Sequence, residues 1–439
     1  MIEGTYNMRK KTTFLATGDS FMTRRLPAGG YTGFQEIKEV IAAHEVRFNN
    51  LEITIHNKEG YPAAFSGGTW AMAEPGILDD LKQFGFNLYN TANNHSGDYS
   101  HGGLLATIRH LRERDMLYAG TGENLAAASA PAYLETSCAR VAMLGVCSTF
   151  HDSDAAGNQG PVLQGRPGLN PLRYQKTFHV EPHYYETLRE IARKTEMNAS
   201  MELTVQNGYA RLLPEGKLYF GGMSFCLSDE NALYTEPLQT DMERITAHIR
   251  EARRQADYVL VSVHSHEFSG RSVVNPAQFL RTFAHTCIDA GADAILGHGP
   301  HELRGVEIYN GKAIFYSLGN FIFQTETVSM QPADAYENAA MSSAAMVGEY
   351  MDRRSRNGTS GYAVQPNIWR SVMAGFTAEN GVITEIKFYP ITLGMDLPRS
   401  RIGFPQLLHS DEVLEYLAEL SRPFGTKMQI ANGVASVML

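Results

Sequence analysis

The sequence contains few cysteines and no long apolar run. Its 439 residues include four cysteines, which lie far apart without a Cys-x-x-Cys pair, so we expect free thiols. No window approaches about 18 consecutive apolar residues, the length that a membrane-spanning helix needs. The apolar stretch after the charged N-terminus is also too short for a signal peptide. We therefore expect a cytoplasmic protein without a membrane segment.

Several enzyme signatures are missing as well. The chain has no Gly-x-Ser-x-Gly elbow and no phosphate-binding Gly-Lys-Ser or Gly-Lys-Thr loop, and Gly120-Thr121-Gly122 is only a fragment of a dinucleotide-binding fingerprint. The net charge of −9 and the pI of about 5.9 argue against a broad nucleic-acid or anionic-membrane surface. With 43% hydrophobic residues, the chain can still bury a large core.

Strands and helices alternate along most of the chain, which predicts an α/β fold built as one domain over residues 1–439. Expected strands cover 12–17, 46–54, 86–89, 117–119, 257–267, 294–296 and 313–323. Expected helices cover 34–44, 78–84, 102–116, 241–255, 276–290 and 411–420, and a hairpin pairs 371–376 with 382–391.

Two segments interrupt this alternation. Residues 151–240 are interpreted as an insertion near the mouth of a site, with a helix at 181–198 and strands at 202–211 and 217–225. Residues 330–367 form a second excursion rich in Met, Ala, Ser and Asn. Long loops inside compact domains are usually functional, so both segments are predicted to be lids.

Polar side chains recur at the points where predicted strands end. They are Asp19, Glu52, the Asn94-His95 pair followed by Asp98, the run His264-Ser265-His266-Glu267, and His298 with His301. Ligands of open α/β sheets bind at this edge. Carboxylates, an amide oxygen and imidazoles together suit Zn, Mn or Fe. Any one of these residues alone could be a polar turn or a structural histidine, as we expect for His248 and His285 inside helices.

Four phrases carry a resemblance to a known family. They are Asn50-Leu51-Glu52, Ala92-Asn93-Asn94-His95-Ser96-x-Asp98, Gly297-His298-Gly299-Pro300-His301 and Tyr316-Ser317-Leu318-Gly319-Asn320-Phe321-Ile322-Phe323. The chain resembles the CapA family of poly-γ-glutamate capsule proteins, whose domain is similar to the calcineurin-like metallophosphoesterases. The resemblance covers about 12–150 and 241–325. It implies a four-layer α/β/β/α sandwich with a metal centre at the strand ends.

The resemblance implies a role for each matching residue. Metal ligands would be Asp19, Glu52, Asn94, His264 and His301. His95 would carry out the acid/base step. Asp98 and Glu267 would orient histidines, and His298 is a further catalytic candidate. The chain departs from the wider phosphoesterases at Phe21, where they carry histidine, which leaves open whether one or two ions bind. It also reads His264-Ser265-His266 where relatives commonly have His-Trp-Gly, so His266 either lines the pocket or adds a ligand.

The resemblance supports several functions. The first is a divalent-metal enzyme, using Mn, Zn, Fe or Ca, that acts on a peptide or γ-glutamyl amide by hydrolysis or by epimerisation of a residue. The alternatives are a non-catalytic component that binds or exports poly-γ-glutamate, and a phosphoesterase. In or beside the two excursions, Arg166 and Trp369 are candidates for contacting the substrate, as is His266 in the pocket wall.

Overall fold

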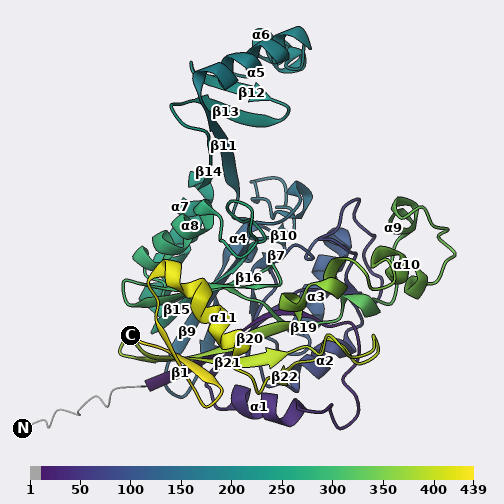
Figure 1. The fold of residues 1–439 in the computed structure, drawn as a ribbon, viewed down its shortest axis with the longest axis vertical. Helices are drawn as coiled ribbons and strands as arrows, with labels where there is room; N and C mark the ends of the chain where they lie inside the picture. The colour runs from purple at the N-terminus through teal and green to yellow at the C-terminus, as the bar shows by residue number, and fades with distance from the viewer. Residues whose placement is uncertain (1–10) are drawn as a thin grey trace, which may run out of the picture.

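The computed structural model describes residues 11–439 and contains two large sheets that face one another (Figure 1). The first sheet has the strand order β23 (Met428–Ala431), β24 (Val434–Val437), β21 (Val382–Thr392), β20 (Arg370–Glu379), β1 (Lys11–Phe21), β2 (Val46–Leu51), β5 (Leu88–Asn90) and β6 (Tyr118–Ala119). In addition, β19 (Asn320–Phe323) pairs with β1, and β22 (Gln406–Leu407) pairs with β21.

The second sheet has six strands. Their order is β17 (Leu303–Tyr309), β18 (Lys312–Leu318), β16 (Ala294–His298), β15 (Tyr258–His264), β9 (Arg140–Cys147) and β8 (Ala132–Glu135). All seven residues of β15 are buried, as expected for a central strand covered on both faces. The strand predicted at 257–267 is confirmed but is shorter, since β15 ends at His264.

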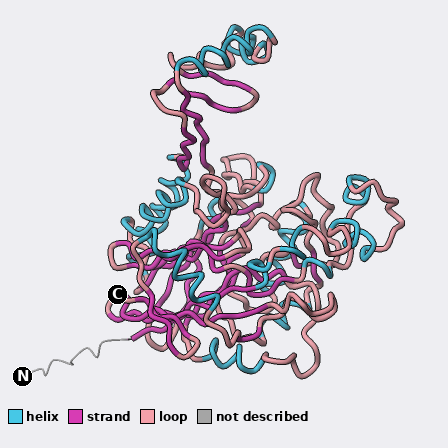
Figure 2. The backbone as a smooth tube through the Cα atoms, in the orientation of Figure 1, coloured by secondary structure: helices cyan, strands magenta, loops and turns pink. Residues whose placement is uncertain are grey.

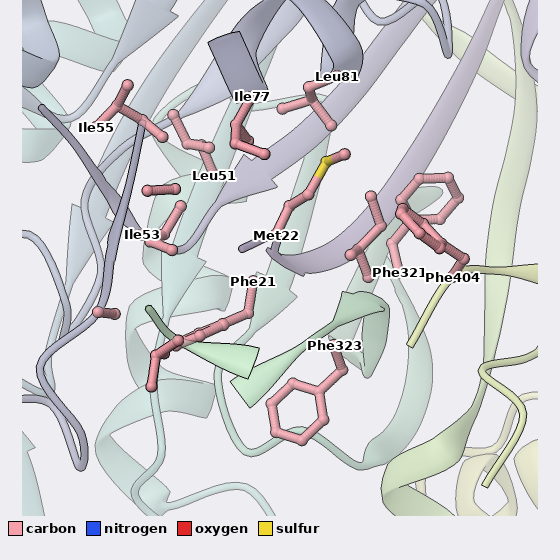
Figure 3. Packing of buried hydrophobic residues seen from close by; sticks show 14 of the residues in the cluster. Phe21, Met22, Leu51, Ile53, Ile55, Ile77, Leu81, Phe321, Phe323 and Phe404 are labelled. Carbon is pink, nitrogen blue, oxygen red and sulfur yellow. The ribbon is translucent and has the colours of Figure 1, made fainter. Parts of the chain in front are cut away.

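Helices cover the outer face of each sheet. Helices α1 (Phe34–Ala42) and α2 (Gly76–Lys82) pack on the first sheet, and Figure 3 shows Ile77 and Leu81 of α2 directed toward Met22 and Leu51. Helices α7 (Gln239–Gln255) and α8 (Gln278–Asp289) pack on the second sheet through a separate apolar cluster. A third cluster fills the space between the sheets. These layers confirm the predicted four-layer α/β/β/α sandwich.

Shorter elements surround this core. They are the two-stranded pairs β3 (Thr54–Ile55) with β4 (Met72–Ala73) and β7 (Thr121–Gly122) with β10 (Gly168–Leu169), and the helices α3 (Ser100–Arg112), α4 (Leu125–Ser129) and α11 (Glu412–Ser421). Across residues 11–439, no helix is long and apolar enough to cross a membrane. All four cysteines are free, and Cys147 and Cys287 are buried, whereas Cys138 and Cys226 are partly exposed.

The single strand predicted at 313–323 is wrong. Gly319 adopts a φ of 68°, which turns the chain, so β18 joins the second sheet and β19 joins the first. The same stretch of chain thereby links the two layers. The Gly319-Asn320 pair inside this otherwise mostly apolar stretch was the signal of the break.

The secondary structure predicted within 151–240 also needs correction. The strand expected at 202–211 is helix α6 (Ala199–Gln206) followed by a loop, and the strand expected at 217–225 is the hairpin β12 (Lys217–Phe220) and β13 (Met223–Leu227). The predicted helix at 181–198 is confirmed as α5 (Pro182–Lys194).

Residues 174–237 form an arm that stands off the two-sheet body (Figures 1 and 2). Its four-stranded sheet has the order β12, β13, β11 (Tyr174–Val180) and β14 (Ala232–Pro237), and it shares no strand with the body. Only the first part of the predicted lid, 151–173, therefore runs along the body. The second excursion, 330–367, contains α9 (Ala333–Asn338) and α10 (Val347–Arg354).

Candidate metal centre

The candidate site lies where strands of both sheets end. Asp19 lies on β1 at an irregular register, paired with Asn50 of β2 on one side and Asn320 of β19 on the other. His264 and His298 end the neighbouring parallel strands β15 and β16 and are direct partners in register. The first sheet therefore contributes carboxylates, and the second contributes imidazoles.

A close approach of two backbones fixes Asp19 in this position. A Cβ at Gly18 would lie 1.8 Å from the carbonyl oxygen of Gly319, and the backbone N–H of Asp19 donates to that same oxygen at 3.0 Å. Only glycine at position 18 allows β1 to lie this near the turn between the two sheets. Asn50 and the backbone of Gly299 then donate to the two carboxylate oxygens of Asp19, at 2.7 and 3.0 Å.

The site residues form two adjacent groups of possible ligands. Asp19, His264 and His298 make up the first group; Glu52, His266 and His301 make up the second, and within each group the ligand atoms lie within 4.8 Å of one another. The His264 ring lies between the groups. Its Nδ1 is 3.6 Å from Asp19 Oδ1, and its Nε2 is 3.6 Å from Glu52 Oε1.

The spacing of these atoms fits a divalent metal ion. Ligand atoms about 2.1 Å from a common ion lie roughly 3.0–3.4 Å from one another. His264 Nε2 lies 3.1 Å from His266 Nε2, inside this range. The Glu52 carboxylate is slightly farther away, with its Oε1 3.6 Å from His264 Nε2.

Unpartnered buried oxygens support the same conclusion. Glu52 is fully buried, yet neither carboxylate oxygen has a hydrogen-bond partner. The Oδ1 of buried Asn94 is also unpartnered, while its amide group donates to the Gly67 carbonyl at 2.8 Å. Isolated buried carboxylates and amide oxygens are costly, and a cation among them would remove that cost. The donor set therefore fits a metal ion.

Burial shifts the pKa values of several residues in the site. Burial raises the pKa of Glu52 well above its ordinary value, and the charges of Asp19 and Asp98 raise it further. Burial opposes ionisation of Asp19, but hydrogen bonding and charge attraction from His298 hold the pKa of Asp19 below its ordinary value. Burial also lowers the pKa of His266 to about 3, so that at neutral pH this imidazole is uncharged and able to bind metal.

Burial is also the main cause that lowers the pKa of two other imidazoles, those of His264 and His301. His301 has a positive φ of 63°, an uncommon conformation for a non-glycine residue and one that occurs at functional sites. Its Nδ1 lies 2.9 Å from Asn320 Oδ1, which accepts the N–H and leaves Nε2 as the free acceptor.

His95 forms a separate buried pair with Asp98. The Nδ1 of His95 donates to Asp98 Oδ2 at 2.7 Å, so Nε2 carries the free lone pair. The backbone N–H groups of Gly67 and Ala71 hold the Asp98 carboxylate at 2.9 and 2.7 Å. The edge of the Phe21 ring packs on His95 at a centroid distance of 5.2 Å. This is the arrangement of an oriented base, as expected from the sequence.

The contacts of Glu267 differ from the prediction. Glu267 was expected to orient a histidine, but its carboxylate accepts from the hydroxyls of Ser148, Ser265 and Thr149, at 2.7, 2.9 and 3.0 Å. Within residues 11–439 no imidazole bonds to it. His298 is fully buried, with Nδ1 3.4 Å from Asp19 Oδ1 and Nε2 2.7 Å from Ser262 Oγ, and its catalytic role stays a prediction.

The two predicted substrate contacts in the excursions also differ from expectation. Trp369 is 3% exposed, and its indole N–H donates to the Tyr362 carbonyl at 2.8 Å. It therefore holds the second excursion in place rather than facing solvent. Arg166 is exposed and donates to the Ala155 carbonyl at 2.8 Å, within its own loop. His266 lies in the second ligand group, which favours the ligand alternative left open by the sequence.

Sequence reasoning missed several supporting residues. Asn50, Asn320 and Ser262 bond to Asp19, His301 and His298. Asn50 and Asn320 lie in the phrases that carry the family resemblance but were given no role, and Ser262 inside β15 gave no signal. Tyr362 gave no signal at all. It comes from the second excursion, and its ring lies 5.9 Å from that of His301.

Comparisons with known proteins identify relatives of the chain. The chain is 34% identical to the uncharacterized protein y4sH of Sinorhizobium fredii, over 97% of this chain and 93% of that protein. It is 24% identical to the capsule biosynthesis protein CapA of Bacillus anthracis, over 72% of this chain and 60% of that protein. A solved structure of a hypothetical protein from Thermus thermophilus covers 86% of this chain and 98% of its own, at 11% identity and a TM-score of 0.39. Residues 13–325 match the family described as bacterial capsule synthesis protein PGA_cap, and the chain belongs to that family.

Proposed function

We propose that this protein is a divalent-metal-dependent enzyme that acts on a peptide or γ-glutamyl amide. The observation that carries the proposal is the fully buried Glu52 carboxylate, which lies without a hydrogen-bond partner beside neutral imidazoles. Such a group is costly in a protein that does not bind a cation. A charged or metal-binding site whose groups have shifted pKa values is a frequent feature of catalytic centres.

The proposed ligands are Asp19, Glu52, Asn94, His264 and His301, with His266 as an additional donor. An ion bound by these groups would polarise the carbonyl oxygen of an amide. The protein supplies the rest of the arrangement. Asn50 and Gly299 orient Asp19, and Asn320 orients His301, so the donors are held before substrate arrives.

His95 is the proposed proton-transfer residue. Asp98 fixes its Nδ1 proton, and Nε2 accepts a proton from the reacting group. In hydrolysis that proton comes from the attacking water and passes to the leaving amine as the C–N bond breaks. In epimerisation His95 takes the proton from Cα, and a solvent water on the other side returns a proton to the opposite face of the same carbon. The existence of this buried, oriented pair favours catalysis over simple binding.

The substrate class rests on the relatives. Two of them are named for capsule or poly-γ-glutamate biosynthesis, the CapA proteins of Bacillus anthracis and Bacillus subtilis. An amide-bonded polymer or peptide is the chemical class that those names share, and an amide carbonyl is a group that the proposed centre can polarise.

The test measures metal content first and chemistry second. Purified protein is analysed for metal, then incubated with γ-glutamyl oligomers and a peptide panel in heavy water and examined by mass spectrometry. Cleavage indicates hydrolysis, and deuterium gain without cleavage indicates epimerisation. Asp19→Ala and His301→Ala should lose metal and turnover together, whereas His95→Ala should keep metal and lose turnover by about 10²–10⁴-fold. If the protein binds the oligomers but leaves every substrate unchanged under all metal conditions, it is instead a non-catalytic binding protein.

A further inference from the structure

A fully buried arginine lies beside the loop that carries His266. Arg304, near the start of β17, is 0% exposed. Burial lowers the pKa of Arg304 to about 10, so this side chain is still charged at neutral pH. Arginine is almost never buried completely unless it is paired. Within residues 11–439 the hydrogen bonds of Arg304 all go to backbone carbonyl groups and none goes to a carboxylate, so these contacts indicate its role.

The bonds of Arg304 join the two ends of one loop. Its Nε donates to the Val273 carbonyl at 2.8 Å, and its two terminal nitrogens donate to the carbonyls of Ser265 and His266, each at 3.2 Å. Because β15 ends at His264 and α8 begins at Gln278, the first two carbonyl partners to follow β15 start the connecting loop and Val273 lies near its far end. One side chain therefore closes the loop.

The loop needs this support because it is exposed. Six of the eight residues from 268 to 275 are exposed, and Gly270 within them has a positive φ of 69°. Exposed loops are more mobile than the strands that they connect. The strand β15 holds His264 in place, whereas His266 depends on the loop for its position.

A second contact fixes the other side of His266. The backbone N–H of His266 donates to Thr149 Oγ1 at 2.9 Å, and that hydroxyl donates to the Glu267 carboxylate at 3.0 Å. With its carbonyl bonded to Arg304, His266 has both backbone polar groups occupied. Its imidazole thus extends from a fixed backbone, with Nε2 3.1 Å from His264 Nε2.

We propose that Arg304 is a positioning residue that fixes His266 for metal binding. This inference rests on the proposed metal centre. A guanidinium presents its N–H donors in a rigid planar fork, so a single arginine can hold carbonyls at both ends of the loop. Because Arg304 is fully buried, it acts through His266 and does not contact the substrate. An arginine that only stabilised the fold would leave metal affinity unchanged.

The test is a double-mutant cycle on the full-length protein, with zinc titrated in competition with a chelator. Arg304→Met should weaken zinc affinity by about 10–100-fold, the usual effect of losing a group that orients a ligand. In a His266→Ala background the same change should alter the affinity by less than about threefold, because the ligand that it positions is already absent. Equal effects of Arg304→Met in the two backgrounds would overturn the proposal.

Arg253→Met is the matched control for a loss of stability. Arg253, on α7, donates to the Asp257 carbonyl and to the Asp293 carboxylate at 2.8 Å each, beside the start of β15 and not its end. Arg253→Met should change zinc affinity by less than about threefold even where it lowers the melting temperature. An affinity loss as large as that of Arg304→Met would contradict the inference. If Arg304→Met does not fold, Arg304→Lys, which keeps the charge but not the fork, takes its place in the cycle with an expected loss of at least about tenfold.

Two further measurements report the ligand and the loop directly. The visible absorption of bound cobalt depends on its ligands, so cobalt-loaded Arg304→Met and His266→Ala should share one spectrum that differs from the wild type and from Arg253→Met. Backbone hydrogen exchange at residues 265–273 should be faster in Arg304→Met. A wild type that binds no divalent metal would overturn the metal centre and this inference together. Zinc binding that Arg304→Met leaves unchanged would overturn this inference alone.

Discussion

Replacing Glu52 with glutamine should stabilise the metal-free protein, and more so as the pH rises. The Glu52 pKa is raised well above its ordinary value by burial and by neighbouring carboxylates. A carboxyl whose pKa is higher in the folded state than in the unfolded state stabilises the fold below its unfolded pKa. That contribution is lost progressively as the pH rises toward the folded pKa, because the unfolded chain releases the proton first.

The size of the effect follows from proton linkage. Above an unfolded pKa of about 4.3, the wild type should lose about 1.4 kcal/mol of unfolding free energy per pH unit relative to Glu52→Gln. An unfolding entropy of about 2.1 cal/mol/K per residue gives about 0.9 kcal/mol per kelvin for this chain. The difference in melting temperature should therefore grow by about 1.5 °C per pH unit.

The assay is thermal unfolding in EDTA from pH 5 to pH 7. Glu215→Gln, a change at an exposed glutamate of the arm, is the matched control and should track the wild type at every pH. With a divalent ion at about 10⁴ times its dissociation constant, the wild type should gain about 5.5 kcal/mol and Glu52→Gln much less. This gain exceeds the roughly 3.7 kcal/mol that the wild type loses by pH 7, so the order of stability should reverse. A wild-type-minus-variant difference that stays flat between pH 5 and pH 7, or no reversal with any metal, would refute this reasoning about Glu52.

Three further predictions concern the fold, the ligands and the second excursion. Gly18→Ala should lower the free energy of unfolding, measured in urea, by more than about 3 kcal/mol, because the added Cβ would lie 1.8 Å from a backbone oxygen. The control is Gly348→Ala on α10, where an added Cβ meets no atom within 4 Å, and it should be neutral or stabilising. His266→Ala should weaken metal affinity by at least about 100-fold in a competition titration with a chelator, and unchanged affinity would remove it from the ligands. Tyr362→Ala should leave metal bound and lower kcat/KM about tenfold, since it lies over His301; normal turnover would remove the lid interpretation of this excursion.

The site was more predictable than the elements around it. Asp19, Glu52, Asn94, His95, His264 and His301 could be identified because each follows an apolar strand, and parallel strands bring their ends to one edge. The residues that orient them could not be separated from ordinary polar residues. Asn320 orients His301 only because Gly319 diverts the chain into the other sheet, and that turn depends on tertiary contacts.

The wrong strand at 202–211 has a specific physical cause. Met201, Leu203 and Val205 alternate with Glu202 and Thr204, which is the pattern of a half-buried strand. The segment nevertheless forms α6, which buries none of these side chains. A periodicity argument assumes that apolar residues face a core, and this helix lies on an arm that has almost none. The failure of the pattern and the exposed apolar surface of the arm have the same origin.

Phe21 gives the pair of His95 and Asp98 an apolar neighbour. Its ring packs on His95 at a centroid distance of 5.2 Å. Elsewhere in the site, His266 places its Nε2 3.1 Å from His264 Nε2, in the group that includes Glu52. An apolar wall next to a carboxylate–imidazole pair excludes water from it, which strengthens the interaction between His95 and Asp98.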